Sequence, residues 1–242
     1  MRVRLRSWLP AEHGVWGLLG AAALVGLPLG SGLAGLPLLG AALVAILVRA
    51  RCQDRLHAPA LVLGAGLAAA LLWATWRMAE DPAWVWWLAG VIVPAGAAAL
   101  IPGRSILVSL GAAIAFSVLG AAVASAGGAP SSWCAFAVVV LAGHLALMVP
   151  LVRAQVRPDP RWIRIAIDLH VAALVIATGA WAAGVIPSGI PLVFALGLAR
   201  CALLVDKRTT MSCSPARIGV REMAWLPVVS AVLVLTLRGA SA

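Results

Sequence analysis

The chain has 242 residues, of which 63% are hydrophobic and only 11% are charged. A soluble fold would have to bury more apolar surface than one core can hold, which excludes an ordinary globular enzyme. The formal net charge of +10 does not indicate nucleic-acid binding, because the 18 basic residues lie in short clusters between apolar stretches. We therefore expect lipid to surround most of the chain.

Nine apolar segments approach the length of about 20 residues that a helix needs to cross a bilayer. In chain order they cover residues 14–30, 33–49, 58–77, 83–101, 105–125, 132–152, 164–186, 189–205 and 219–237. Helix breakers such as Asp81-Pro82 and Pro102-Gly103 fall between the segments. The sequence therefore predicts an all-α, polytopic membrane protein of nine transmembrane helices that form a single domain over residues 1–242.

The arginines predict the orientation of these helices. Counted along alternating connections, 16 of the 18 basic residues lie on the side of the N-terminus, and only Arg77 and Arg238 lie opposite. Because basic residues resist translocation, we expect an N-terminus in the cytoplasm and a C-terminus outside. Small residues at four-residue spacing, such as Gly26 with Gly30 and Gly120 with Ala124, would allow close contacts between helices.

The connections after the second and sixth segments resemble each other. Residues 48–55 and 152–161 both contain Val-Arg-Ala followed by one Asp among arginines. Four helices separate them, which allows a parallel repeat of residues 1–104 and 105–205 followed by the last helix. Arginine-rich inner loops also occur without a repeat, so both interpretations stay open. The binding candidates in these loops are Arg49, Arg51, Asp54, Arg55, Arg153, Arg157 and Asp159.

The remaining candidate side chains lie at helix starts or at membrane depth, where an unpaired ionisable group is costly. Glu12 and His13 open the first helix, where an acid also suits an ordinary helix start. His144 is the deepest group, and a neutral imidazole bonded to a neighbouring helix is its alternative interpretation. Asp168 and His170 are two residues apart and should point to opposite sides of the seventh helix.

The sequence contains no P-loop, no G-x-S-x-G, no H-E-x-x-H and no Rossmann glycine pattern. Each inner loop has a single Asp, which disfavours Mg²⁺ held against a diphosphate, and no cofactor is assigned. Cys52, His57, Cys201 and Cys213 lack the ligand spacing of a zinc site, so isolated thiols are the expected interpretation and no metal site is predicted.

The opening residues 9–16, Leu-Pro-Ala-Glu-His-Gly-Val-Trp, resemble the P-x-E-H-G-x-W start of the YwiC-like family of bacterial membrane proteins. The loop at residues 152–161 and the Ser-Pro-Ala-Arg-Ile-Gly stretch at residues 214–219 are also similar to that family. The resemblance spans the chain and implies a multi-pass protein of the bacterial cytoplasmic (inner) membrane. It implies no established activity.

A more distant resemblance is to the UbiA superfamily of intramembrane prenyltransferases, which share nine helices, an inside N-terminus and two four-helix halves. Their two Asp-rich motifs occupy the loops after helices 2 and 6, where this chain has only Asp54 and Asp159 among arginines. The resemblance implies a UbiA-like bundle and, if the protein is an enzyme, prenyl or lipid transfer. The departure favours an anion site in which the two arginine loops meet and hold a headgroup directly.

We therefore expect the protein to bind or process a membrane lipid, quinone or isoprenoid at a cytoplasmic-side cavity. One alternative is a small-solute or proton-coupled transporter with His144, Asp168 and His170 along its path. Another is a non-catalytic subunit of a membrane complex.

Overall fold

The structure is a computed structural model that describes residues 13–52, 58–100, 106–156, 159–206 and 215–240. The described residues form nine α-helices and no strand. The helices are α1 (His13–Leu29), α2 (Gly35–Cys52), α3 (Ala58–Met78), α4 (Trp84–Leu100), α5 (Ile106–Ala126), α6 (Ser131–Val156), α7 (Pro160–Ala182), α8 (Ile190–Asp206) and α9 (Pro215–Gly239). The predicted all-α fold and the positions of all nine helical segments are confirmed.

The largest boundary difference concerns α7, which was predicted over residues 164–186. It begins at Pro160 because the Asp159 side chain caps the helix and a proline suits its first turn. It ends at Ala182, and Gly184 adopts a φ of 72°, which glycine tolerates and a continuing helix does not. Hydropathy alone does not detect these two signals.

Five helices are long and apolar enough to cross a membrane by length and composition: α2, α3, α5, α6 and most of α7. The apolar parts of α1, α4, α8 and α9 are shorter among the described residues. Large apolar side chains are also exposed on the outside of the bundle, for example Val62 and Leu63 on α3 and Val175 and Ile176 on α7. A soluble protein avoids such surfaces, and this pattern is typical of a helical membrane protein.

Helices α1 and α5 pack closely at the centre of the bundle. A Cβ atom added to Gly26 would lie 2.6 Å from the Gly120 carbonyl oxygen, and one added to Gly30 would lie 3.0 Å from the Ala124 oxygen. These small residues, whose spacing allows close helix contact, therefore do lie at such a contact. The turns beyond these helices are also joined, because the backbone N–H groups of residues 31 and 32 both donate to the Gly127 carbonyl.

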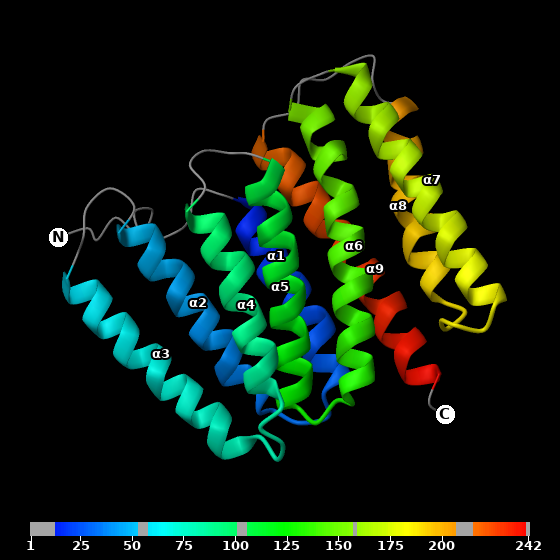
Figure 1. The fold of residues 1–242 in the computed structure, drawn as a ribbon. Helices are drawn as coiled ribbons and strands as arrows, with labels where there is room; N and C mark the ends of the chain where they lie inside the picture. The colour runs from blue at the N-terminus through cyan, green and yellow to red at the C-terminus, as the bar shows by residue number, and fades with distance from the viewer. Residues whose placement is uncertain (1–12, 53–57, 101–105, 157–158, 207–214, 241–242) are drawn as a thin grey trace.

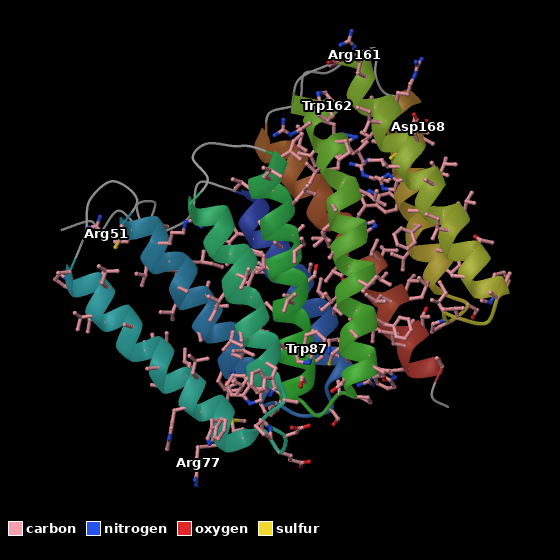
Figure 2. All side chains as sticks on the ribbon, in the orientation of Figure 1. Arg51, Arg77, Trp87, Arg161, Trp162 and Asp168 are labelled. Atoms are coloured by element: carbon pink, nitrogen blue, oxygen red, sulfur yellow. The ribbon has the colours of Figure 1, made fainter. Side chains whose placement is uncertain are left out.

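The helices alternate in direction, so the C-terminal ends of α2, α4, α6 and α8 lie on the same face of the bundle (Figure 1). We call this the arginine face, because Arg51, Arg153 and Arg161 lie there, whereas Arg77 lies on the opposite face (Figure 2). Along the bundle, α2 and α3 form one end and α7 and α8 the other, with α5 and α6 between them (Figure 1).

Candidate functional site

Helix α7 has one buried side and one exposed side. Ile163, Ala166, His170 and Ala177 are buried at helical spacing, and His170 has no exposed surface. Asp168 is exposed on the outer side of α7, together with arginines of its first turn (Figure 2). The prediction that Asp168 and His170 point to opposite sides is confirmed, and only His170 belongs to the interior.

The His170 ring is held by its own helix. Its Nδ1 atom lies 2.7 Å from the Ala166 carbonyl oxygen, one helical turn earlier. The Sγ atom of Cys201, on α8, lies 3.6 Å from the same Nδ1. The other ring nitrogen, Nε2, is buried and has no hydrogen-bond partner. One nitrogen therefore fixes the ring, and the other remains available for a further contact.

Gly197 on α8 brings His170 and His144 together. A Cβ atom added to Gly197 would lie 2.7 Å from Nε2 of His170 and 3.5 Å from Cε1 of His144. The two rings thus converge on one point of α8, although they belong to α7 and α6. His144 is 4% exposed, and its Nδ1 atom is also buried without a hydrogen-bond partner. We call His144, His170 and the facing Gly197 the His144–His170 site, which contains both partnerless nitrogens.

The site lies deep in the bundle. His144 is twelve residues from the end of α6 at Val156, and His170 is ten residues from the start of α7 at Pro160. At 1.5 Å per residue these separations are about 18 Å and about 15 Å from the arginine face. This depth is near the middle of a hydrocarbon layer about 30 Å thick.

Between the site and the arginine face lie further polar side chains. Arg200 is three residues after Gly197, on the same side of α8, and is 3% exposed. Its guanidinium carbon lies 5.7 Å from the centre of the Trp225 ring of α9, a cation–π arrangement. Nearer the helix end, Arg153 is stacked in the same way on Trp162, also at 5.7 Å. Charged and aromatic groups therefore lie between the site and the arginine face.

The interior on the other side of the site is mainly apolar. One hydrophobic cluster joins α6, α8 and α9 there, and it includes Leu141, Val193, Val229, Leu233 and Leu237. Ser230 is buried at the level of these residues on α9. Among the described residues, the charged groups near the His144–His170 site therefore lie on its arginine-face side, and the polar group named on the other side is the uncharged Ser230 hydroxyl.

The described arginines next to the two loops belong to different parts of the bundle. Arg49 and Arg51 end α2, which packs on α3, α5 and α1, whereas Arg153 ends α6 at the other side of α5. Arg51 and Arg161 lie at opposite ends of the molecule (Figure 2). Among the described residues, α2 and α6 both pack on α5. The remainder of both loops lies outside the described residues, so the joint pocket of the two loops stays a prediction.

Asp159, a candidate from the second loop, has a local structural role. Its carboxylate accepts a hydrogen bond of 2.9 Å from the Arg161 backbone N–H and so caps α7. Four other candidates, Glu12, Asp54, Arg55 and Arg157, lie outside the described residues. His13 is the first residue of α1, and only its backbone is described.

No group of three or more His, Cys, Asp or Glu side chains that could hold a metal ion is present among the described residues. Cys52 ends α2, and Cys201 is buried beside His170, while His57 and Cys213 lie outside the described ranges. The sequence interpretation missed Gly197, Arg200 and Trp225. The spacing of Gly197, Arg200 and Cys201 on one side of α8 was the signal that could have indicated a shared polar contact.

Comparisons of the chain with protein-family descriptions, with curated proteins and with solved structures find no match.

Proposed function

We propose that all nine helices span the bacterial cytoplasmic membrane, with the arginine face in the cytoplasm and the C-terminus outside. The support is the agreement between sequence and fold: the alternating helix directions put Arg51 and Arg161 on one face and Arg77 on the other (Figure 2). Positively charged residues favour the cytoplasmic side of a membrane.

Within this membrane the protein binds the polar headgroup of an amphiphile, a lipid, quinone or isoprenoid, at the His144–His170 site. The observation that carries this function is a pair of buried imidazole rings that converge on Gly197, each of which has one nitrogen without a hydrogen-bond partner. A polar atom in an apolar environment is costly unless it is hydrogen-bonded, so a ligand that bonds these nitrogens gains binding free energy. We propose this site in place of the loop pocket expected from the sequence.

The distribution of polar groups favours binding from the cytoplasmic side over passage through the membrane. Arg200 and Trp225 lie between the site and the arginine face, where a cation and an aromatic ring suit a polar or anionic headgroup. A transporter needs a polar path to both faces. Beyond His144 the interior is lined by residues such as Leu141 and Val193, so proton-coupled transport has less support.

The test is the identity of the amphiphile that remains bound when the protein is purified in mild detergent. Native mass spectrometry of the wild type should show a bound amphiphile at a stoichiometry near one. The double variant His144→Leu/His170→Leu should lose it, because both nitrogens are replaced by apolar groups of similar size. Asp168→Asn is the matched control, since Asp168 is on the outer side of the same α7, and it should keep the amphiphile.

A wild-type protein without a bound amphiphile, or a double variant that retains it at the wild-type level, would contradict this function. Thermal unfolding of each variant by circular dichroism separates loss of binding from loss of the fold.

A further inference from the structure

The hydrogen-bond direction of the His170 ring is fixed by α7 itself. Nδ1 lies 2.7 Å from the Ala166 carbonyl oxygen, and a carbonyl oxygen can only accept a hydrogen bond. Nδ1 must therefore carry the proton and donate it. In a neutral imidazole the second nitrogen then has no proton and presents a lone pair. Nε2 of His170 is thus a hydrogen-bond acceptor.

No described group of the protein donates to this acceptor. Nε2 is buried and has no hydrogen-bond partner. It faces Gly197, which has no side chain to offer, and the Cys201 thiol lies 3.6 Å from Nδ1, at the other side of the ring. Because no described protein group donates to this buried acceptor, a donor brought by a ligand would be bound in preference to an acceptor.

We infer that the headgroup bound at the His144–His170 site is a hydrogen-bond donor, a neutral hydroxyl that donates to Nε2 of His170. This inference rests on the proposed function and narrows its ligand class. Isoprenoid alcohols and quinols carry such a hydroxyl. Quinones, ethers and fully ionised phosphate esters present only acceptor oxygens, which a lone pair on Nε2 repels.

The experiment compares pairs of probes in which one member has a hydroxyl group that can donate a hydrogen bond and the other member does not. The wild-type protein is reconstituted in phosphatidylcholine nanodiscs, and binding is measured by calorimetry for geranylgeraniol and its methyl ether, and for a menaquinol and its menaquinone. In the pair that matches the natural headgroup, we expect the hydroxyl-bearing probe to bind with an affinity about tenfold higher than the other member. This ratio corresponds to one hydrogen bond to a buried acceptor. The responding pair distinguishes an alcohol from a quinol.

Variants of His170 connect the preference to this atom. In His170→Leu the acceptor is gone, so the two members of a pair should bind equally. His170→Gln keeps an amide that can accept at the position of Nε2, and it should retain a preference for the donor, which keeps the test valid if the leucine variant does not fold. Asp168→Asn should retain the full wild-type preference.

Equal binding of both members in the wild type, or a co-purified amphiphile whose headgroup has no hydroxyl, would overturn the inference and leave amphiphile binding intact. Absence of any co-purified amphiphile together with no probe binding would instead overturn the proposed function. A preference unchanged in His170→Leu would show that the donor is recognised elsewhere and would also overturn the inference.

Discussion

Replacing Gly197 by alanine tests the packing that forms the site. The added Cβ atom would lie 2.5 Å from Cδ2 and 2.7 Å from Nε2 of His170, closer than real Cβ contacts. The ring is a rigid group held by its bond to Ala166, so either the ring leaves this position or α7 and α8 separate. The structure therefore predicts that Gly197→Ala destabilises the bundle.

The magnitude follows from three opposing contributions. Forcing a methyl group against the His170 ring costs about 1–3 kcal/mol, and loss of the His170–Ala166 hydrogen bond costs about 1 kcal/mol. Alanine in a helix interior returns about 0.5–1 kcal/mol relative to glycine. We expect a net loss of about 1–3 kcal/mol in the free energy of unfolding. Gly179, on α7, has nothing within 4 Å of an added Cβ, so Gly179→Ala should only gain stability.

The assay is reversible unfolding of the purified protein in mixed micelles, followed by circular dichroism, for both single variants and for Gly197→Ala combined with His170→Ala. Removing the ring should relieve the clash, so Gly197→Ala should cost little or nothing in the His170→Ala background, a coupling that a double-mutant cycle measures. If Gly197→Ala is as stable as Gly179→Ala, or equally destabilising with and without the His170 ring, the packing described for α7 and α8 is refuted.

Two further predictions concern the bundle as a whole. Gly26→Ala should destabilise the protein by about 3 kcal/mol in the same assay, because its Cβ would lie 2.6 Å from the Gly120 carbonyl oxygen. Gly20→Ala is the control, because a Cβ added there has nothing within 4 Å. Equal stabilities of the two variants would contradict the α1–α5 contact. Alkaline phosphatase fused to the C-terminus should be active, because the proposed topology places that end outside the cytoplasm. Green fluorescent protein fused after Asp206 should fluoresce, because that position is on the cytoplasmic side. The reverse pattern would exclude the proposed topology.

Much of this fold could be predicted from the sequence because local chemistry determines it. Apolar length and the Gly and Pro breakers define the nine helices, and the periodicity of 3.6 residues separates Asp168 from His170. The close approach of α1 and α5 follows from small residues at four-residue spacing. Each of these properties depends on residues within one or two turns of each other.

The lateral order of the helices could not be predicted in the same way. Alternating directions put the connections after α2 and α6 on one face, but they leave open which helices are neighbours. Helix α2 packs on α3 and α5, and α6 packs on α5 and α7, so Arg51 at the end of α2 and Arg161 at the start of α7 lie far apart (Figure 2). The close approach of His144 and His170 depends on the same lateral order of the helices. It also depends on Gly197 of α8, and a glycine by itself does not indicate a polar site.

Buried hydroxyl groups show why the two ends of the bundle have different roles. Thr75 on α3 and Ser117 on α5 each donate to the carbonyl four residues earlier, Leu71 and Ala113, so their own helices satisfy them. In an apolar medium such groups need no ligand. Trp84 has a buried indole nitrogen without a partner, but it begins α4 at a helix end, which lies near the interface in the proposed membrane topology.

The end formed by α6 to α9 differs because its orphaned nitrogens lie in mid-helix on two neighbouring helices. A structural histidine could bond to its own helix with one nitrogen, as His170 does, and face a donor of the next helix with the other. Here the facing residue is Gly197, and a larger side chain is excluded by the His170 ring itself. The protein thus lacks a stabilising hydrogen bond to Nε2 of His170 in the part of the bundle where Arg200 and Trp225 lie between the site and the arginine face. Ser230 on α9 also has a buried hydroxyl oxygen without a partner. Partnerless polar atoms on facing helices are expected where binding, and not stability, determines the sequence.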